Sequence, residues 1–224
     1  MGKIMKTVLI TGANSGIGFA LAKKLIENGY FVIGTSRNGL IDIVSENIFT
    51  IKLDVTDSDS IEIANKIIRE KFKTIDFLIN NAGIAPDLGK KTPEINSFKM
   101  TFETNVTGLV LFTESIIDLL QEKGKILNIS SVMGALNRVS GFDSPAYRMS
   151  KSAVNMYTKI LSERLLDKNI SVISIHPGWV KTKLAGQSAP LTPEFSANGI
   201  YNLLEKNLST GTFWNAETQE EMVW

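Results

Sequence analysis

The sequence predicts a single α/β domain with a doubly wound parallel sheet. Short apolar runs rich in Val and Ile alternate along the chain with stretches whose apolar residues recur at helical spacing. Strands that alternate with helices in this way form a parallel sheet covered on both faces. The 224 residues contain no repeat, low-complexity run or linker, and their length suits one such domain better than two small ones.

The first strand–helix unit contains a glycine turn, KTVLITGANSGIG, at residues 6–18. Val8–Ile10 form a short buried strand, the turn holds Gly12, Gly16 and Gly18, and FALAKKLIENG continues as a helix. In such a turn, backbone N–H groups and the positive end of the helix dipole hold a phosphate. The spacing differs from the G-x-G-x-x-G of many dinucleotide sites, and a glycine turn can serve the backbone alone. Its place between strand and helix favours phosphate binding.

Further strands and helices are expected downstream. The strands lie at residues 30–35, 48–53, 75–79, 124–130, 170–175 and 211–214, and the helices at 60–72, 96–121, 145–166 and 194–205. Either Asp57 or Ser58 caps the first of these helices, and Pro145 stands where the third can begin. Loops are expected at 84–94 and from 131 to about 143.

Composition and charge exclude several classes of protein. Apolar residues make up 43% of the chain and charged residues 21%, which is ordinary for a globular protein. A net charge of +1 without a basic cluster gives no support for a nucleic-acid or anionic-membrane partner. With no Cys and a single His, neither a disulfide nor a metal site is expected. No membrane-spanning segment or secretory signal is seen, so we expect a cytoplasmic protein.

Five motifs follow one another along the chain. They are TGANSGIG at 11–18, NNAG at 80–83, Asn105, Ser130-Ser131 before the YRMSK of Tyr147–Lys151, and Pro177-Gly178 with Thr182. With these motifs in this order, the chain resembles the short-chain dehydrogenase/reductase family over nearly its whole length. The AYRMSK and GTFWNAETQEEMVW segments are similar to a compact, carbonyl-reductase-like branch of that family. The resemblance implies a Rossmann-type sheet of about seven strands in the order 3-2-1-4-5-6-7. It also implies a cofactor half at about 1–125 and a catalytic and substrate half at about 126–224.

Tyr147 and Lys151 are the expected acid–base pair. Four residues apart on a helix, the two side chains lie on one face, one turn apart. A phenol with a pKa near ~10 is a poor acid–base catalyst at neutral pH, and a neighbouring ammonium stabilises the phenolate and lowers that pKa. An isolated pair of this kind is more often part of an ordinary amphipathic helix. The accompanying motifs favour catalysis here.

The resemblance implies two further catalytic residues. Ser131 donates a hydrogen bond that polarises the substrate carbonyl, whereas Ser130 is structural, because strand alternation lets only one of the two face the site. Asn105, inside an apolar helix, completes a proton relay between Lys151 and solvent, and the alternative is an ordinary surface Asn. The resemblance also implies that Lys151 binds the cofactor ribose.

Arg37 bears on the choice of cofactor. At this strand end a carboxylate binds the ribose hydroxyls of NAD, whereas an Arg suits the 2′-phosphate of NADP. No carboxylate lies in the turn, so we expect NADP(H) in preference to NAD(H), unless Arg37 is a solvated loop residue. The resemblance implies further cofactor contacts from Gly12, Asn14, Ser15, Gly16, Ile17, Gly18, Asp54, Val55, Asn81, Ala82, Gly83, Tyr147, Lys151, Pro177, Gly178, Val180 and Thr182. Of these, Asn81 ties neighbouring strands together, and the nearby His176 is structural.

These residues predict an NADP(H)-dependent oxidoreductase that interconverts a carbonyl and an alcohol. Met133, Phe142, Trp179 and Leu184 are expected to line an apolar substrate pocket, and the 135–146 loop to shape its wall. Helices at 96–121 and 144–167 are expected to join a homodimer or a homotetramer.

Two other functions stay open at this point. One is a dinucleotide-binding sensor or signalling protein with little turnover, because fold alone does not settle function. The other is a sugar-nucleotide epimerase or dehydratase, which can share the Tyr–Lys pair. Relatives of that kind usually have a different glycine spacing and a larger C-terminal domain, which makes it the weakest of the three.

Overall fold

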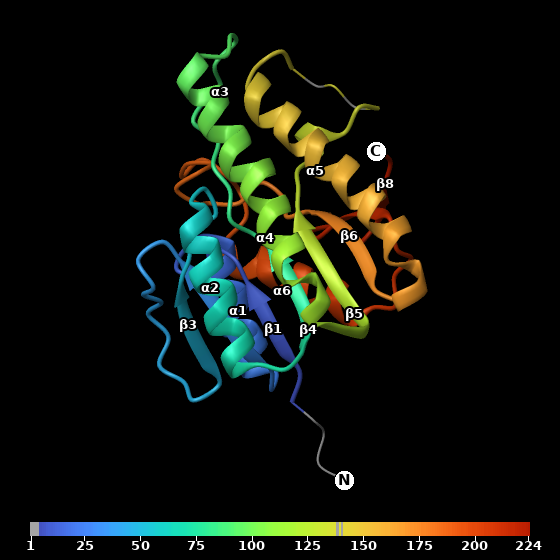
Figure 1. The fold of residues 1–224 in the computed structure, drawn as a ribbon. Helices are drawn as coiled ribbons and strands as arrows, with labels where there is room; N and C mark the ends of the chain where they lie inside the picture. The colour runs from blue at the N-terminus through green and yellow to red at the C-terminus, as the bar shows by residue number, and fades with distance from the viewer. Residues whose placement is uncertain (1–4, 138, 140) are drawn as a thin grey trace.

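The computed structural model describes residues 5–137, 139 and 141–224, and its centre is one twisted sheet (Figure 1). The strand order is β3-β2-β1-β4-β5-β6-β7-β8, with parallel pairing except between β7 and β8. The predicted order 3-2-1-4-5-6-7 is confirmed, and β8 is an added two-residue edge strand too short to show as a sequence pattern. The strands are β1 (Thr7–Ile10), β2 (Phe31–Ser36), β3 (Ile48–Lys52), β4 (Ile75–Asn80), β5 (Leu120–Ile129), β6 (Ser171–His176), β7 (Thr212–Asn215) and β8 (Glu221–Met222).

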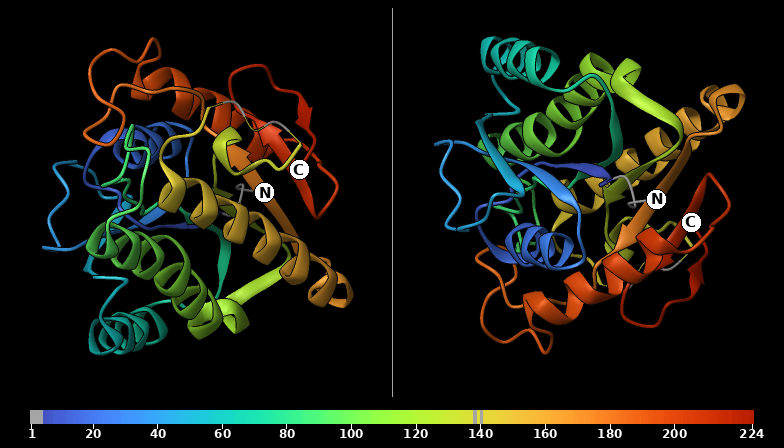
Figure 2. Two further views of the ribbon diagram at one scale, coloured as in Figure 1. Left: turned by 90° about the horizontal axis from the view of Figure 1, so that it is seen from above. Right: turned by 90° about the horizontal axis from the view of Figure 1, so that it is seen from below.

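Helices cover both faces of the sheet. They are α1 (Gly16–Glu27), α2 (Ser58–Lys71), α3 (Ile95–Phe102), α4 (Leu109–Ile116), α5 (Pro145–Arg164) and α6 (Pro193–Glu205). Figure 2 shows α1 and α6 on one side and α2, α4 and α5 on the other. Successive side chains of β1 point to opposite faces of the sheet. Val8 and Ile10 lie in the core beneath α1 and α6, and Leu9 lies in the core beneath α2, α4 and α5. In the described part of the chain, no helix combines the length and apolarity needed to cross a membrane.

The predicted helix at 96–121 is wrong in its interior and at its end. A π-helical turn, Glu103–Gly108, separates α3 from α4, and a 3₁₀ turn follows α4. Leu120 already belongs to β5, where it pairs with Ile75, so this strand starts earlier than the predicted residue 124. The apolar spacing of IIDLLQE fits a helix and a strand alike, and tertiary pairing with β4 decides between them.

Helix α2 resolves the choice between two candidate caps. Asp57 is the N-cap, and its Oδ1 accepts hydrogen bonds from the N–H groups of Asp59 at 2.9 Å and Ser60 at 3.3 Å. Ser58 is the first helical residue. The arrangement satisfies two of the amides that a helix start leaves without an internal partner.

Candidate active site

A cleft of about 1730 Å³ lies at the carboxyl ends of the parallel strands. Its walls come from the segments that follow β1, β2, β3, β4, β5 and β6, which is where open parallel sheets bind ligands. A pocket for one drug-sized ligand measures roughly 300–1,000 Å³. This cleft therefore has room for a dinucleotide together with a second molecule.

Most of the predicted site residues line this cleft. They are Ser131, Tyr147 and Lys151 of the catalytic set, Met133, Trp179 and Leu184 of the substrate set, and Gly12, Asn14, Ser15, Gly16, Ile17, Arg37, Asp54, Val55, Asn81, Ala82, Gly83, Pro177, Gly178, Val180 and Thr182 of the cofactor set. Asn105 and Gly18 are buried beside it.

Phe142 is a wrong prediction for the substrate pocket. Its side chain is 76% exposed and lies outside the residues that line the cleft. The ring packs against the ammonium group of Lys91, 5.1 Å from the ring centroid, so a surface contact takes the place of the expected pocket contact. The 135–146 loop, expected to shape the substrate wall, includes residues 138 and 140, which lie outside the described residues.

The glycine turn has the geometry of an anion cradle. Gly12 and Gly16 have positive φ angles of 68° and 55°, which side chains rarely tolerate. A Cβ on Gly18 would lie 2.3 Å from the carbonyl oxygen of Gly12. Helix α1 begins at Gly16, so the amides of its first turn lack helical partners and carry the positive end of the dipole. The turn fits the pyrophosphate of a dinucleotide.

Asn81 ties β4 to the glycine turn, as predicted. Its side-chain amide donates to the carbonyl oxygens of Thr11 at 2.9 Å and Gly12 at 3.0 Å. In return, the Thr11 hydroxyl accepts from the N–H groups of Asn81 at 2.9 Å and Ala82 at 3.0 Å. These four bonds fix the turn to the neighbouring strand end.

Arg37 and Asp54 stand together where β2 and β3 end. Burial raises the pKa of the Asp54 carboxyl, but hydrogen bonds from Thr56 and the charge of Arg37 outweigh it, so this pKa lies below its usual value. The Thr56 main-chain N–H and hydroxyl donate to Asp54 at 3.0 Å and 2.8 Å. This end of the cleft therefore offers an exposed guanidinium beside an ionised carboxylate.

Tyr147 and Lys151 share the inner face of α5. Lys151 Nζ lies 5.6 Å from the Tyr147 ring centroid and donates a 2.7 Å hydrogen bond to the carbonyl oxygen of Ile129. Ser131 follows β5 and lines the same cleft, where its side chain has a lowering effect on the pKa of Tyr147. The three side chains expected to do the chemistry are thus buried together at the catalytic end of the cleft.

Burial dominates the pKa values of this pair. It raises the pKa of Tyr147 to about 12, against the lowering effect of the Ser131 hydrogen bond. It lowers the pKa of Lys151 to about 8. The predicted lowering of the Tyr147 pKa by Lys151 is wrong for this structure, because the cost of burying a phenolate dominates and only Ser131 opposes it.

Asn105 connects the loop after β4 to α5. It lies in the π-helical turn, and its amide both accepts from the Ile84 N–H and donates to the Ile84 carbonyl oxygen, each at 2.8 Å. It also donates to Ser150 Oγ at 3.1 Å. Its burial and these bonds differ from those of an ordinary surface Asn.

Two polar residues beside the catalytic set have other partners. Ser130 Oγ donates to the Asn155 side chain at 2.6 Å and to the Lys151 carbonyl oxygen at 3.3 Å, which fits a structural role. His176 lines the cleft, and its buried Nδ1 has no hydrogen-bond partner among the described residues. Burial lowers the pKa of His176 to about 4, so the imidazole is neutral at physiological pH.

One buried carboxylate of the site is not predicted from the sequence. Asp87, in the loop after β4, is fully buried and accepts hydrogen bonds from the N–H groups of Ala146 and Tyr147. Helix caps are recognised directly before a helix, whereas Asp87 precedes Ala146 by 59 positions. The local sequence therefore carries no signal for this contact.

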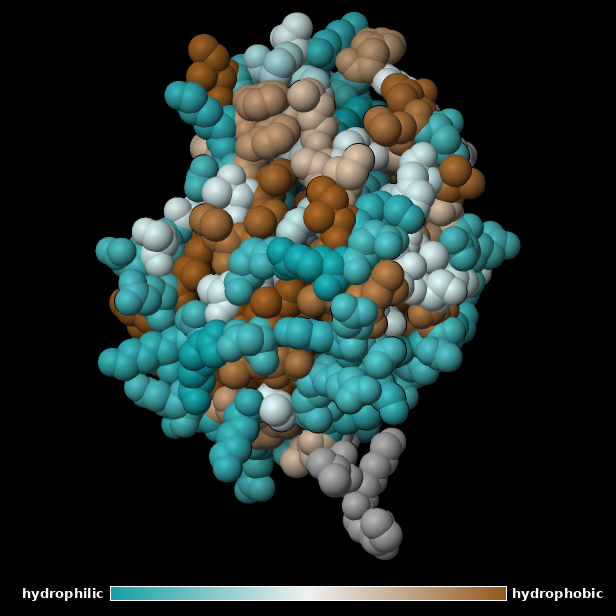
Figure 3. All heavy atoms as spheres, turned by 45° about the vertical axis from the view of Figure 1, so that its right-hand side comes forward, coloured by the Kyte–Doolittle hydropathy of each residue, from teal (hydrophilic) through white to brown (hydrophobic). Residues whose placement is uncertain are grey.

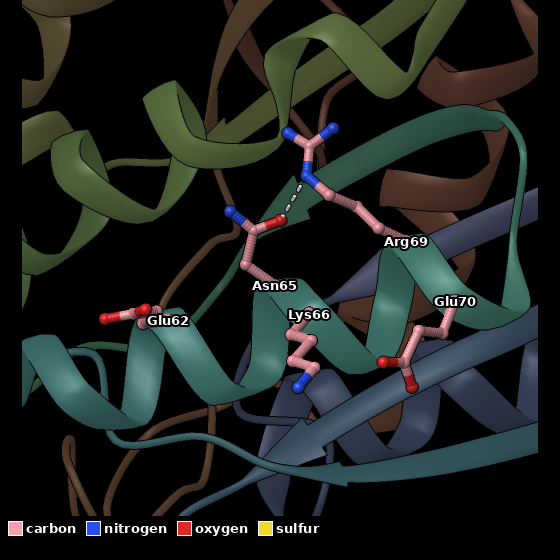
Figure 4. Close-up of a pocket in the computed structure, with 5 residues that line it drawn as sticks. All are labelled: Glu62, Asn65, Lys66, Arg69 and Glu70. Atoms are coloured by element: carbon pink, nitrogen blue, oxygen red, sulfur yellow. Dashed lines mark hydrogen bonds between the residues drawn. The ribbon is translucent and has the colours of Figure 1, made fainter.

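A second, smaller hollow of about 440 Å³ lies on the outer side of α2 (Figure 4). It is lined by Glu62, Asn65, Lys66, Arg69 and Glu70. Arg69 donates to Asn65 and forms an ion pair with Asp118, each at 2.6 Å. The lining contains no predicted site residue. Across the described ranges of the chain, no group of three His, Asp or Glu side chains is placed to hold a metal ion.

Comparisons with known proteins identify the family of the chain. A family model for short chain dehydrogenases matches residues 6–191. The chain is 32% identical over 216 residues to the short-chain dehydrogenase anuI of Penicillium roqueforti, covering 86% of each protein. It is 31% identical over 222 residues to the serine 3-dehydrogenase of Agrobacterium fabrum, covering 94% of this chain and 87% of that protein.

Solved structures are similar over the whole domain. The NADPH-bound carbonyl reductase from chicken fatty liver has a TM-score of 0.88 at 28% identity, covering 100% of this chain and 96% of that one. The carbonyl reductase Sniffer of D. melanogaster has a TM-score of 0.86 at 28% identity, covering 98% and 100%. The chain therefore belongs to the short-chain dehydrogenase family and is an NAD(P)-dependent oxidoreductase with a carbonyl-reductase-like fold.

Proposed function

We propose that this protein is an NADP(H)-dependent reductase that interconverts a carbonyl and an alcohol. The observation that carries the proposal is the buried set of Ser131, Tyr147 and Lys151 in a cleft that also contains a dinucleotide cradle. When bound, the cofactor supplies or accepts the hydride. Every other task falls to the side chains of this chain.

Tyr147 acts as the acid in the reducing direction. Its pKa of about 12 keeps the phenol protonated at neutral pH, so the hydroxyl can donate its proton to the developing alkoxide. Ser131 donates a hydrogen bond to the same oxygen and stabilises its charge. The Lys151 ammonium stabilises the phenolate that remains and binds the cofactor ribose. Asn105 completes the relay that returns a proton.

The glycine turn would hold the pyrophosphate, and Arg37 would pair with the 2′-phosphate of NADP. The exposed guanidinium of Arg37 and its position after β2 support this preference. An NADPH-bound carbonyl reductase is a structural neighbour, whereas a neighbouring 3-ketoacyl reductase is complexed with NADH, and between these two the exposed Arg37 supports NADP(H). Backbone at Val180 and the hydroxyl of Thr182 would hold the nicotinamide carboxamide.

The substrate wall supports an apolar or aromatic carbonyl compound. Met133, Trp179 and Leu184 line this part of the cleft, together with Phe98 and Phe102 of α3. The two phenyl rings are stacked with their centroids 4.7 Å apart. Such surfaces bind apolar ligands, and a few polar groups orient them.

A homodimer or homotetramer is proposed through the outer faces of α3, α4 and α5. Apolar side chains are exposed there at Met100, Leu111, Met149, Met156 and Ile160, and Figure 3 shows apolar side chains gathered on the upper part of one face of the molecule. Light scattering coupled to size exclusion checks this contact. Ile160→Asp should lower the measured mass to that of one chain.

The test of the proposed function follows NADPH oxidation over a panel of aldehydes, ketones and quinones. Tyr147→Phe removes the donated proton, so we expect kcat to fall by about 10²–10⁴-fold. Tyr157→Phe is the matched control, because Tyr157 lies on the same helix and donates to Glu114 at 2.7 Å instead of facing the cleft. Equal turnover in Tyr147→Phe would refute the assigned role. Tight NADPH binding without reduction of any carbonyl would favour the sensor alternative.

A further inference from the structure

We propose that Asp87 is a positioning residue for the reaction. Its carboxylate holds the first turn of α5, and through that turn it keeps the Tyr147 hydroxyl beside Ser131. The inference rests on the proposed function, because it assigns Asp87 a part in the same acid–base step.

Helix α5 starts without a local side-chain cap. Ser144, at the N-cap position, has a positive φ of 55° and makes no side-chain bond to the first turn. Pro145 brings no N–H of its own. The next two amides are those of Ala146 and Tyr147, and both donate to Asp87, at 2.7 Å to Oδ2 and 3.3 Å to Oδ1. The residue expected to transfer the proton is thus bound through its own main chain.

Burial distinguishes Asp87 from an ordinary cap. It is fully buried, and none of the ion pairs among the described residues includes it. Burying an unpaired carboxylate is costly, and here amide hydrogen bonds and the positive end of the helix dipole compensate. Asp57 caps α2 with an exposed side chain directly before its helix. The buried contact at α5 does more, because it fixes the helix to a distant loop.

The same loop is held at both ends by groups of the site. Near its start, Ile84 is bound through its N–H and its carbonyl oxygen to the side chain of Asn105. Further along, the Gly89 N–H donates to Ser144 Oγ at 2.9 Å, and the Ser144 N–H donates to the Lys90 carbonyl oxygen at 2.8 Å. Asn105 and the start of α5 are therefore both hydrogen-bonded to the same short segment, residues 84–90.

The residues on either side of Asp87 face the cleft. Pro86 and Leu88 line its wall, while Asp87 between them is bound to α5. A shift of this segment would move the substrate wall and the Tyr147 hydroxyl together. Displacement of a reacting group by about 1 Å can cost about 10²-fold in rate, so a fixed Asp87 contact has a direct effect on turnover.

The test compares Asp87→Ala, Asp87→Asn and Asp87→Glu for kcat and for NADPH affinity. Loss of the acceptor in Asp87→Ala should lower kcat by about ten- to a hundredfold, while the Kd for NADPH changes by less than about threefold because the glycine turn is untouched. Asp87→Asn keeps one acceptor oxygen, for the 2.7 Å bond from the Ala146 N–H, and should rescue part of this loss. Asp87→Glu keeps the charge but displaces it by one methylene, and it should not rescue.

Asp57→Ala is the control for simple loss of a helix cap. It removes the cap of α2, so it should lower the melting temperature without lowering kcat. If Asp87→Ala does not fold, the Asn and Glu variants carry the test. Rescue by Glu but not by Asn would show that the charge, not the position, matters and would overturn the inference.

The failure of this inference is distinct from failure of the proposed function. Unchanged kcat in Asp87→Ala, with Tyr147→Phe inactive, would overturn the role of Asp87 alone. A native protein that reduces no carbonyl, or full turnover in Tyr147→Phe, would overturn the proposed function and the role of Asp87 with it.

Discussion

The two ends of the cleft are built by different means. At the end of the cleft near the glycine turn, the expected cofactor end, main-chain groups form most of the site. Glycines with positive φ, the free amides of α1 and the hydrogen bonds of Asn81 shape the cradle. At the end that holds Tyr147 and Lys151, the expected catalytic end, buried side chains form the site. Burial raises the pKa of Tyr147 and lowers the pKa of Lys151. Binding and chemistry should therefore be separable by substitution, since each depends on a different kind of group.

The same contrast extends below the site. The core beneath α1 and α6 is a cluster of apolar side chains around Leu21. Beneath α4 and α5, a buried hydrogen-bond chain joins Asn80 to Asn128 at 2.8 Å, Asn128 to Thr158 at 2.9 Å, and Thr158 to Ser174 at 2.9 Å. Such networks rigidify a core where their members are paired, and among the described residues only the buried Oδ1 of Asn80 in this network has no partner. Beneath the helix that carries Tyr147, buried polar hydrogen bonds are thus added to the apolar cluster of that side.

Among the substitutions that separate neighbouring residues of the cleft, the largest effect is expected for two adjacent serines. Ser131→Ala removes the donor proposed for the substrate oxygen, and loss of one such donor costs about 10²–10³ in kcat. Ser130→Ala should leave kcat within a few-fold but lower stability by about 1–3 kcal/mol, because the buried Asn155 oxygen loses its 2.6 Å partner. Steady-state kinetics and urea unfolding on both variants provide the measurement. Equal loss of kcat in the two would contradict the assignment.

At the cofactor end, Gly18→Ala should act on binding. The added Cβ would lie 2.3 Å from the Gly12 carbonyl oxygen, and overpacking of this kind costs about 1–3 kcal/mol. Because the displaced turn is the cradle, we expect the Kd for NADPH to rise by about ten- to a hundredfold in a fluorescence titration. Gly29→Ala, at the other end of α1, meets no atom within 4 Å, and its φ of 79° costs stability but leaves the turn unchanged, so affinity should stay native. Native affinity in Gly18→Ala would show that the turn does not bind the cofactor.

Arg37→Gln tests how much a side chain contributes to NADPH binding at the cofactor end of the cleft. An exposed charge-assisted contact to a phosphate contributes about 1–1.5 kcal/mol, so the KM for NADPH should rise by about tenfold. The KM for NADH, which lacks the 2′-phosphate, should stay unchanged and serves as the internal control. A parallel rise in both KM values would assign Arg37 a structural role instead.

His176 gives the smallest effect at neutral pH and a clear one in acid. Burial lowers its pKa from 6.5 to about 4, so the folded state binds fewer protons than the unfolded state between these values. Acidification through this window should destabilise the fold by up to about 3 kcal/mol. The non-titrating His176→Asn should lack this slope, and urea unfolding at pH 7, 5.5 and 4 measures it. Since His176 is the sole histidine, an identical slope in both proteins would contradict the assignment.

Much of the difference between the two ends of the cleft was predictable from the sequence, because it depends on motifs of neighbouring residues. The succession of strand, glycine turn and helix predicts the anion cradle. The four-residue spacing predicts that Tyr147 and Lys151 lie on one face of a helix. The strand order and the Asn81 tie agree with these expectations. The early start of β5 was not predictable, since its pairing with the distant Ile75 decides it, and the two residues of β8 are too few to show a sequence pattern.

The site features that were not predicted depend on the path of loops and on the burial of side chains. Phe142 was placed in the pocket on its apolar character, but its loop carries it to the surface. Asp87 could not be recognised, because its partners lie at the start of a helix that is distant in sequence. The raised pKa of Tyr147 was missed as well, because spacing reveals a neighbouring ammonium but not the desolvation that opposes it.

The most direct test measures binding and turnover on one preparation of Tyr147→Phe. Tyr147 is buried in the cleft wall, and the anion cradle does not depend on its hydroxyl. We predict that the Kd for NADPH stays within about threefold of the native value while kcat with the best carbonyl substrate falls by about 10²–10⁴-fold. Turnover that survives, or NADPH binding that is lost together with it, would contradict the division of the cleft into a binding end and a chemical end.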